Sequence, residues 1–282
     1  MKIAWIGTGV MGKPMVSHII SAGYQVTAYN RSLEKLNDLS CHKATTLKEA
    51  VNEADVIFSI VGYPKDVEQI YLKEDGIFTY AKTGAICIDM TTSSATLAEK
   101  LYTEAKKRHL HMLDAPVSGG DIGAKNASLS IMVGGDEDIY IKVNDLLQCL
   151  GNKITYIGAA GSGQHCKMVN QIVVAGNIAA ITEGMVYAKE MGLDGQTILS
   201  AIGSGAAASW QVTNNGPKIL SEDFAPGFYI HHFIKDLNLV KEEAAKKQLQ
   251  CQIAELVVGL YESLSDEEKY LGTQALIKAY QK

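Results

Sequence analysis

Three polar residues in the segment GSGQHCKMVNQ, residues 161–171, have side chains that could take part in acid–base chemistry. Lys167, Asn170 and Gln171 stand at positions i, i+3 and i+4 of an expected helix, so they share one face. The helix is expected to begin near Gln164, which places Lys167 in its first turn. There the helix dipole and partial burial would both lower the pKa of the lysine toward neutral pH. Such a lysine suits general acid/base catalysis, although this segment alone favours an ordinary solvated lysine.

A second segment, DAPVSGGDIGA at 114–124, offers a place for an anion. An apolar strand is expected to end at Val117, and Ser118, Gly119 and Gly120 follow it directly. Consecutive small residues expose backbone N–H groups, which can bind a carboxylate at the binding edge of a sheet. An ordinary turn explains this segment equally well when the segment is taken alone.

The N-terminal stretch IAWIGTGVMG contains the pattern G-x-G-x-x-G as Gly7, Gly9 and Gly12. The pattern follows an expected strand and opens an expected helix, which is the context that a dinucleotide fingerprint requires. Gly7 would make the tight turn, Gly9 would admit the pyrophosphate and Gly12 would let helix and strand pack closely. Thr8, Val10 and Met11 complete the predicted cofactor-binding loop.

The end of the next strand bears on the choice between NADP and NAD. An acidic residue is typical of NAD sites at this position, whereas this chain has Asn30, Arg31 and Ser32. Arg31 would attract a 2′-phosphate, Ser32 would donate a hydrogen bond to it and Asn30 would bind the ribose. We therefore predict NADP(H) as the preferred cofactor, with NAD(H) as the alternative. A solvated Arg31 and a helix-capping Asn30 are the competing interpretation.

The expected secondary structure that positions these residues differs between the two halves of the chain. Strands are expected at 2–6, 24–30, 54–61, 84–90, 111–117, 128–135 and 153–158, and most alternate with helical stretches. This alternation predicts a parallel-rich α/β sheet of the Rossmann type. After Gly163 the pattern becomes helical throughout, with helices expected at 167–191, 194–202, 212–221, 233–248, 250–264 and 268–280. We therefore expect a nucleotide-binding domain at 1–160 and an all-helical domain at 161–282, which begins with a long helix.

Composition narrows the functional class. Among 282 residues, 47% are hydrophobic, 20% are charged and the formal net charge is −5, which argues against a nucleic-acid partner. The five cysteines show neither zinc-site nor disulfide spacing, which predicts a reducing, cytoplasmic location. The apolar runs are too short or too polar to predict a membrane span, and His231 with His232 lacks further ligands for a metal.

Four motifs together resemble the β-hydroxyacid dehydrogenase family, of the 3-hydroxyisobutyrate dehydrogenase type. They are IGTGVMGKPM, DAPVSGGDIGA, GAAGSGQHCKMVNQ and FIKDLNLV, and they span most of the chain. The resemblance implies an oxidoreductase that moves a hydride between the nicotinamide and a small β-hydroxyacid or semialdehyde. It also implies a Rossmann domain joined to a helical domain that mediates homodimers or homotetramers.

The resemblance assigns roles residue by residue. Lys167 would be the catalytic acid/base, and the substrate carboxylate would be bound by Ser118, Gly119 and Gly120 with help from Asn170 and Gln171. Val61, Thr92 and Lys235 would contact the cofactor. Many members have asparagine at the position of Gln171, so this departure places substrate geometry in question.

Two alternatives stay open beside this interpretation. Imine reductases share the fold, but those relatives typically carry aspartate or tyrosine in place of Lys167. A non-catalytic NADP-binding interaction module is the other alternative, and such proteins lose the lysine and gain basic segments. Neither change is present in this sequence.

Overall fold

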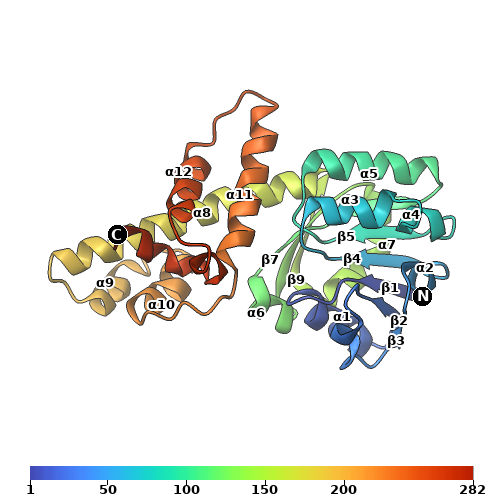
Figure 1. The fold of residues 1–282 in the computed structure, drawn as a ribbon, viewed down its shortest axis with the longest axis horizontal. Coiled ribbons are helices and arrows are strands. Elements are labelled where there is room, and N and C mark those ends of the chain that lie inside the picture. Colours follow the sequence, from blue (N-terminus) through green and yellow to red (C-terminus); the bar gives the residue numbers. More distant parts are fainter. Residues whose placement is uncertain (282) are drawn as a thin grey trace. The chain divides into compact units, whose positions relative to one another are not determined.

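The structure is a computed structural model that describes residues 1–281. It divides into two compact units, Met1–Lys167 and a second unit that begins at Met168. The division falls inside the 29-residue helix α8 (Ser162–Glu190), so that helix contributes to both units (Figure 1). The boundary predicted near residue 160 lies immediately before this helix.

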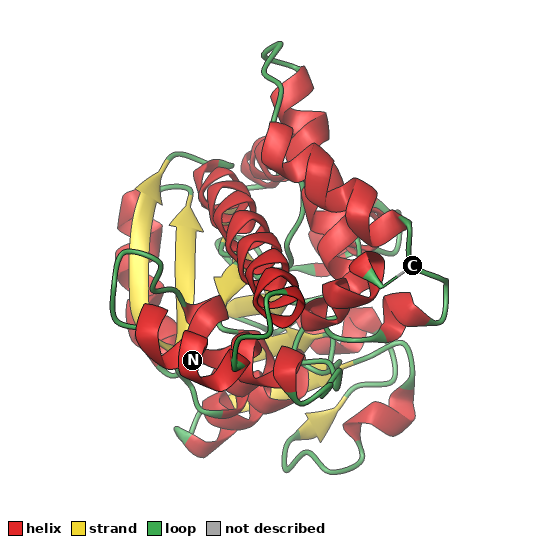
Figure 2. Cartoon of the chain, turned by 90° about the vertical axis from the view of Figure 1, so that its left-hand side faces the viewer, coloured by secondary structure: helices red, strands yellow, loops and turns green. Residues whose placement is uncertain are grey.

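The first unit is built on one nine-stranded sheet (Figure 2). Its strands are β1 (Lys2–Ile6), β2 (Gln25–Tyr29), β3 (His42–Lys43), β4 (Val56–Ser59), β5 (Ile86–Asp89), β6 (His111–Asp114), β7 (Val117–Ser118), β8 (Leu129–Gly134) and β9 (Gly151–Gly158). The strands β3-β2-β1-β4-β5-β6 are all parallel, whereas β8 runs antiparallel to β6 and β7 and parallel to β9. The expected parallel-rich Rossmann fold followed by a helical half is confirmed.

The central strands are apolar throughout because both faces of the sheet are covered. Trp5 of β1 pairs in register with Phe58 of β4, and their rings stack with centroids 5.1 Å apart. These two residues belong to the core on one face, while Ile6 and Ile57, their sequence neighbours, belong to the core on the other. The period of two therefore divides each strand between two cores.

The helices of the first unit include several that the sequence interpretation did not anticipate. They are α1 (Gly12–Ser21), α2 (Leu47–Val51), α3 (Pro64–Leu72), α4 (Ile77–Tyr80), α5 (Ala95–Lys107), α6 (Gly120–Lys125) and α7 (Glu137–Gln148), with a 3-10 turn at Leu33–Leu36. The sequence predictions missed α3, α4, α6 and α7. For α7 a signal was present, since Ile139, Val143, Leu146 and Leu147 recur at helical spacing behind an acidic first turn.

The second unit is helical, as predicted, but two of its segments are not ordinary α-helices. Its α-helices after α8 are α9 (Gly195–Ile202), α10 (Gly216–Leu220), α11 (Ile230–Ala245) and α12 (Gln252–Glu262). A π-helix occupies Gln211–Asn215, and 3-10 helices occupy Glu268–Tyr270 and Thr273–Tyr280, so the α-helices expected at 212–221 and 268–280 are only partly α-helical. Pro217 and the preceding Gly216 explain the break in the first of these segments.

By length and composition alone, α8 is also able to cross a membrane, which the sequence interpretation did not anticipate. Only 33% of its most apolar window is buried in the chain. Core helices of soluble proteins can have the same length and composition, so these two features are weak evidence for a membrane span. The exposed residues of α8 include Val169, Val173 and Tyr187 as well as charged residues.

Candidate active site

The glycine loop between β1 and α1 has the shape that a dinucleotide needs. Gly7 has a φ of +99°, and a Cβ there would lie 2.1 Å from the carbonyl oxygen of Ile60. A Cβ on Gly12 would lie 2.2 Å from the carbonyl oxygen of Gly7, so both positions require glycine. Around Gly9, by contrast, a Cβ would meet nothing within 4 Å. The loop is therefore closed on its protein side and open on the side where a pyrophosphate would approach.

Thr8 adds a polar group to this loop. Its side chain is buried, and among the described residues its hydroxyl oxygen is one of four buried side-chain polar atoms without a hydrogen-bond partner. A buried hydroxyl without a partner costs free energy, and a bound phosphate oxygen would satisfy it. Val10 and Met11 continue the turn, with Val10 61% exposed. The residues of the loop thus fit the cofactor that the sequence predicts.

The segment after β2 lies beside the glycine loop because β1 and β2 are parallel neighbours. The Oδ1 atom of Asn30 accepts a hydrogen bond from the backbone N–H of Thr8 at 3.0 Å, and its Nδ2 donates to the carbonyl of Ser32 at 3.0 Å. Asn30 therefore ties the end of β2 to the glycine loop, a structural role that the sequence did not suggest. Arg31 is exposed and Ser32 half-buried at this same edge.

The strand order reverses between β1 and β4, and Val61 follows β4 at this switch point. Ligands of open α/β sheets bind in the crevice at such a reversal. The backbone N–H of Val61 donates to the hydroxyl of Thr91 at 3.0 Å, which joins this edge to the loop that carries Thr92. The predicted cofactor residues of the first unit therefore gather at the carboxyl ends of β1, β2, β4 and β5, whereas Lys235 lies on α11 of the second unit.

A buried carboxylate that the site predictions omitted holds the start of α8. Asp114, the last residue of β6, accepts hydrogen bonds from the N–H groups of Gly161 at 2.8 Å and Gln164 at 2.9 Å. Burial raises the pKa of Asp114, and these amide donors oppose that rise. Because Asp114 organises the turn before Gln164, α8 begins at Ser162 rather than near residue 164. Lys167 consequently lies in the second turn, where the helix dipole acts on it less than predicted.

Gln164 connects this helix to the predicted nicotinamide loop. Its Nε2 donates to the carbonyl of Thr91 at 2.8 Å, and its Oε1 accepts from the N–H of Ser93 at 2.9 Å. Both ends of one buried amide thus clamp the residues on either side of Thr92. Lys167 follows Gln164 at i+3 on the same helix face, and its side chain is 7% exposed. The structure therefore brings Thr92 and the turn that carries Lys167 together, although 75 positions separate these residues in the sequence.

The predicted carboxylate-binding segment lies at the end of β7. Ser118 is half-buried, and Gly119 and Gly120 have φ values of +135° and +63°. Two successive positive φ values turn the backbone sharply, and a Cβ on Gly119 would approach Cδ2 of Leu129 at 3.1 Å. This conformation makes glycine necessary at both positions and exposes backbone amides to a ligand.

The predicted site residues of the second unit meet where α8 packs on α11. Asp236 is buried, and its Oδ2 accepts a hydrogen bond from Nε2 of Gln171 at 2.7 Å. Its Oδ1 lies 2.9 Å from Nζ of Lys235, an ion pair rather than a well-directed hydrogen bond. The Oε1 of Gln171 in turn accepts from Nδ2 of Asn170 at 2.8 Å. Asp236 thus organises three of the predicted residues.

The histidine pair on α11 is packed among aromatic rings. The rings of His231 and His232 lie with centroids 4.2 Å apart, and Tyr229 and Tyr270 contact His231. Burial, followed by the charges of His231 and Lys235, lowers the pKa of His232 to about 4. In the part of the chain that the structure describes, no three His, Cys, Asp or Glu side chains are placed to hold a metal ion.

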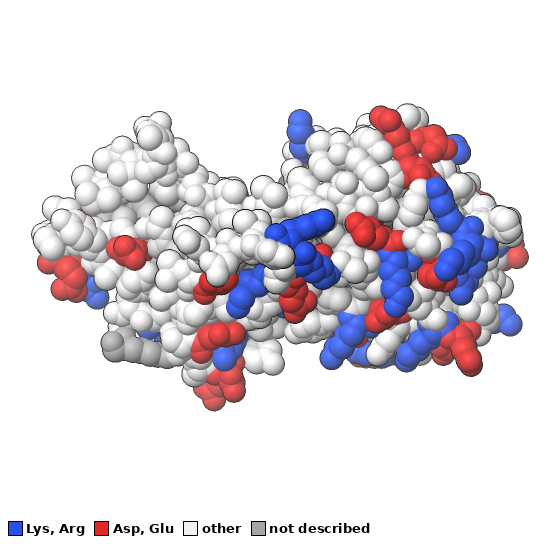
Figure 3. All heavy atoms as spheres, turned by 90° about the horizontal axis from the view of Figure 1, so that it is seen from above, with Lys and Arg blue, Asp and Glu red and all other residues white. Residues whose placement is uncertain are grey.

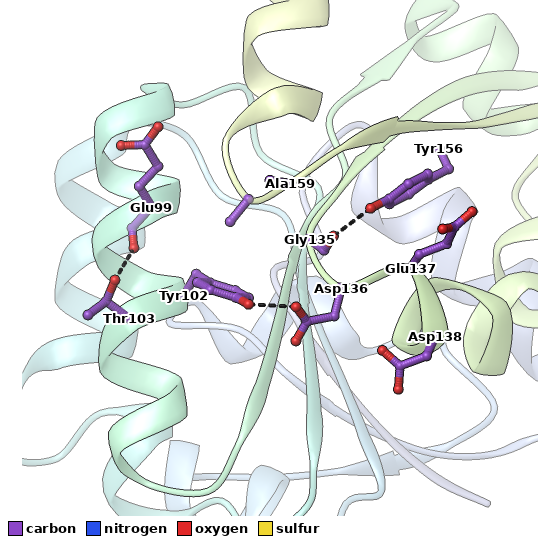
Figure 4. Close-up of a pocket in the computed structure, with 10 residues that line it drawn as sticks. Glu99, Tyr102, Thr103, Gly135, Asp136, Glu137, Asp138, Tyr156 and Ala159 are labelled. Atoms are coloured by element: carbon purple, nitrogen blue, oxygen red, sulfur yellow. Dashed lines mark hydrogen bonds between the residues drawn. The ribbon is translucent and has the colours of Figure 1, made fainter.

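A cavity of about 590 Å³ in the first unit does not contain the predicted residues (Figure 4). It is lined by acidic and aromatic side chains, including Glu99, Tyr102, Asp136 and Glu137. The hydroxyl of Tyr102 donates to Oδ1 of Asp136 at 2.5 Å, and Asp136 is the residue before α7. Acidic residues at a helix start stabilise the helix dipole, so the fold itself accounts for this charge.

The surface charges of the first unit are mixed. On the face drawn in Figure 3, basic and acidic side chains intersperse. The first unit also contains several ion pairs. Examples are Lys100 with Glu68 at 2.6 Å and Lys107 with Glu104 at 2.6 Å. This face therefore differs from the single-sign basic surface that nucleic-acid binding requires.

Comparison with known proteins identifies the family. Residues 2–158 match the model described as the NAD binding domain of 6-phosphogluconate dehydrogenase, and residues 161–280 match the NAD-binding domain of NADP-dependent 3-hydroxyisobutyrate dehydrogenase. The chain belongs to the β-hydroxyacid dehydrogenase family. The resemblance drawn from the four sequence motifs is thereby confirmed.

Individual relatives of this β-hydroxyacid dehydrogenase cover nearly its whole length. The probable 3-hydroxyisobutyrate dehydrogenase-like 1 of Arabidopsis thaliana is 42% identical over 100% of this chain and 85% of its own. The 2-hydroxy-3-oxopropionate reductase of Escherichia coli is 36% identical over 86% of this chain and 84% of its own. The solved structure of Mycobacterium tuberculosis 3-hydroxyisobutyrate dehydrogenase with L-serine is 30% identical, with a TM-score of 0.92 over 100% of this chain and 99% of its own.

The imine reductase alternative is more distant. An imine reductase from Pseudomonas sp. is 18% identical with a TM-score of 0.65, a likeness that shows the fold alone. The family membership instead makes this chain an NAD(P)-dependent oxidoreductase that acts on the CH–OH group of hydroxyacids. Two nucleotide-binding family domains, and relatives that are named dehydrogenases and reductases, support this conclusion.

Proposed function

We propose that this β-hydroxyacid dehydrogenase interconverts a small β-hydroxyacid and its semialdehyde with NADP(H), and that Lys167 is the catalytic acid/base. The observation that carries the proposal is the Gln164 clamp, whose two hydrogen bonds to Thr91 and Ser93 fix the turn before Lys167 against the predicted nicotinamide loop. A buried lysine held one turn beyond that clamp is suitably placed for proton transfer at the oxygen of the substrate carbon that exchanges the hydride.

The proposed roles follow from the chemistry of each group. Bound NADP(H) would supply or accept the hydride. In reduction, the Lys167 ammonium donates a proton to the carbonyl oxygen as negative charge develops there, and in oxidation the neutral amine removes the hydroxyl proton. The backbone amides at Ser118, Gly119 and Gly120 hold the substrate carboxylate and thereby orient the reacting carbon.

The cofactor preference is the second part of the proposal. Arg31 is exposed at the end of β2, next to a loop that Asn30 holds in place, and no carboxylate occupies residues 29–32 to repel a 2′-phosphate. We therefore assign NADP(H) as the preferred cofactor. Arg31→Asp should reverse the ratio of kcat/KM for NADPH over NADH, and an unchanged ratio would exclude this role for Arg31.

The variant Lys167→Ala tests the catalytic proposal. Its oxidation of NADPH is measured with glyoxylate, succinic semialdehyde, methylmalonate semialdehyde and tartronate semialdehyde. The variant should lose about 10²–10⁴ in kcat while its Kd for NADPH, measured by fluorescence, stays unchanged. Lys100→Ala, which removes a solvent-exposed ion pair with Glu68, is the matched control and should keep full turnover. Near-normal turnover by Lys167→Ala would refute the assignment. A wild-type protein that binds NADPH but reduces none of these aldehydes would favour the non-catalytic alternative.

We also propose a homo-oligomer in a reducing, cytoplasmic compartment. Val169 and Val173 of α8 and Ile253 and Leu256 of α12 are exposed apolar side chains, and a Cβ on Gly176 of α8 would lie 3.6 Å from Cγ2 of Ile253. A contiguous apolar surface of this kind favours contact with a second copy. All five cysteines are free thiols, which supports a reducing compartment. Sedimentation of the wild type and of Val173→Glu tests the interface, and an unchanged mass would argue against this surface.

A further inference from the structure

The hydroxyl of Thr91 connects the loop after β5, in which it lies, to the loop after β4. Its Oγ1 donates a hydrogen bond to Oδ1 of Asp89 at 2.7 Å and accepts one from the backbone N–H of Val61 at 3.0 Å. A backbone N–H can only donate, so the single proton of the hydroxyl is directed toward Asp89. Thr91 is 2% exposed. This buried hydroxyl therefore uses both its donor and its acceptor to join two loops of the first unit.

The group that holds Thr91 is itself fixed in the sheet. Asp89 is the last residue of β5, and its Oδ1 also accepts from the backbone N–H of Thr91 at 3.2 Å. The same oxygen accepts from the hydroxyl of Ser59, which pairs in register with Asp89 as the last residue of β4. Asp89 is buried. Thr91 is thus attached by two hydrogen bonds to a carboxylate at the ends of two neighbouring strands, and it provides a fixed point for Val61.

On its other side the segment Ile60–Val61 lies against the glycine loop. A Cβ on Gly7 would lie 2.1 Å from the carbonyl oxygen of Ile60 and 3.5 Å from Cγ1 of Val61. A Cβ on Gly12 would lie 2.8 Å from Cγ2 of Ile60. Because β4 lies between β1 and β5 in the sheet, this segment separates the glycine loop from the loop of Thr91. Its position therefore determines the shape of the cofactor crevice between those two loops.

We infer that Thr91 is a positioning residue for the dinucleotide, whose hydroxyl holds the segment Ile60–Val61 against the glycine loop and so keeps the crevice in its binding shape. Without the hydroxyl, the N–H of Val61 loses its acceptor and the segment is free to move away from Gly7. Part of the binding free energy of the cofactor would then be used to restore the crevice. The inference rests on nucleotide binding within the proposed function, and neither on the choice between NADP and NAD nor on Lys167.

Two substitutions of Thr91 provide the test. Thr91→Val keeps the branched shape and removes the hydroxyl, whereas Thr91→Ser keeps the hydroxyl and removes the methyl group. The Kd values for NADPH and for NADH are measured without substrate, from the fluorescence of the reduced nicotinamide. For the cofactor that the wild type binds more tightly, Thr91→Val should raise Kd by about tenfold, and Thr91→Ser by less than about threefold. If Thr91→Val does not fold, Thr91→Ala removes the hydroxyl without adding an atom, and the same rise is expected.

Tyr71→Phe is the matched control, because it removes a buried hydroxyl at the opposite end of the same network. The hydroxyl of Tyr71 lies 2.9 Å from Oγ of Ser59, and the hydroxyl of Ser59 lies 2.8 Å from Oδ1 of Asp89. Tyr71→Phe should therefore lower the denaturant midpoint about as much as Thr91→Val does, since each variant loses hydrogen bonds of a buried hydroxyl. Its Kd for the cofactor should stay within about twofold of the wild-type value, because the bond from Val61 to Thr91 is kept.

The outcomes separate this inference from the rest of the proposed function. An unchanged Kd in Thr91→Val overturns the role of Thr91, and so does an equal rise in Thr91→Ser or in Tyr71→Phe. A wild type that binds neither NADPH nor NADH overturns nucleotide binding, and this inference with it. A wild type that binds cofactor but converts no hydroxyacid or semialdehyde counts against the proposed reaction alone, because the Kd values still decide the role of Thr91.

Discussion

Each unit has one buried aspartate that holds predicted site residues in place, and the two aspartates do so by different means. Asp114 in the first unit is satisfied by backbone amides of Gly161 and Gln164, whereas Asp236 in the second unit is satisfied by the side chains of Lys235 and Gln171. The first arrangement depends on the path of the main chain and on glycines that let it approach. The second depends on which side chains two packed helices present. Substitutions should therefore disturb the first unit through added atoms and the second through lost partners.

The largest expected effect comes from removing a partner in the second unit. Asp236→Ala leaves the ammonium of Lys235 and the amide of Gln171 without their shared acceptor in a buried position. Breaking a buried ion pair from one side costs about 3 kcal/mol or more of unfolding free energy. Hydrogen exchange measured by mass spectrometry, which reads each unit separately, should show the loss in peptides of α8 and α11 after residue 168. Asp236→Asn keeps one oxygen and should lose less, and equal losses in the two variants would contradict the argument from partners.

An added methyl group tests the first unit. A Cβ on Gly163 would lie 2.4 Å from the carbonyl oxygen of Met132 and 2.7 Å from that of Asp114, so Gly163→Ala must displace the start of α8. We expect a loss of about 2–3 kcal/mol, at the upper end for overpacking because the clashing atoms are backbone. Gly184→Ala on the same helix is the control. Nothing lies within 4 Å of a Cβ there, and alanine should stabilise the helix by up to about 1 kcal/mol.

The fluorescence of Trp5 can be used to measure the loss of stability in Gly163→Ala. The chain has two tryptophans, and Trp5 is fully buried in the first unit, so a Trp210→Phe background leaves it as the only tryptophan to be excited selectively. Denaturant unfolding followed at Trp5 should shift to a lower midpoint in Gly163→Ala and stay unchanged in Gly184→Ala. Equal midpoints for the two alanine variants would contradict the claim that the backbone carbonyls near Gly163 leave no room for a Cβ.

A third prediction concerns pH in the first unit. Burial raises the pKa of Asp89 to about 6, against the hydrogen bonds that it accepts from Thr91 and Ser59. The folded state then holds a proton that the unfolded state releases near its ordinary pKa of 3.8. The contribution of this group to the free energy of unfolding is present below pH 4 and is lost as pH rises to about 6, by about 2–3 kcal/mol. Asp89→Asn should flatten this slope in the Trp5 signal, and an undiminished slope would assign it to other groups.

The second unit should respond to the same pH range in the opposite direction and more weakly. Because burial lowers the pKa of His232 to about 4, the folded state binds fewer protons than the unfolded state between pH 4 and 6.5. The contribution of His232 to the free energy of unfolding is therefore present above pH 6.5 and is lost as pH falls toward 4. Solvent screening of this half-buried ring limits the effect to about 1 kcal/mol. His232→Gln should reduce the pH dependence of hydrogen exchange in α11, and an unaltered profile would count against this cause.

The sequence alone was enough to predict most of the first unit's strands and the position of its nucleotide loop. It missed the short strand β3 and treated β6 and β7 as one strand at 111–117. The glycine spacing is a local pattern, although the contact that requires Gly7 is with the carbonyl oxygen of Ile60 after β4, and only Gly12 is required by a contact within the loop, with the carbonyl oxygen of Gly7. Alternation of apolar runs with helices likewise fixes a parallel sheet. The helix α7 was missed although its apolar spacing was visible. The start of α8 was misplaced because the residue that organises it, Asp114, lies 47 positions earlier than the amide of Gly161 that it accepts from.

For the site, residue types determined what each side chain could do, and only packing decided which partner it has. The motifs pointed to Lys167, Ser118 and Asn170, and no spacing rule indicated that Gln164 would clamp the nicotinamide loop. Nor did the sequence show that Gln171 would reach Asp236 on another helix, 65 positions away. Hydrogen bonds act over about 3 Å in space and carry no signal along the chain. The sequence by itself therefore determined the family, the fold and the types of side chain available for chemistry. The tertiary structure decided which of these residues Asp114 and Asp236 hold in place.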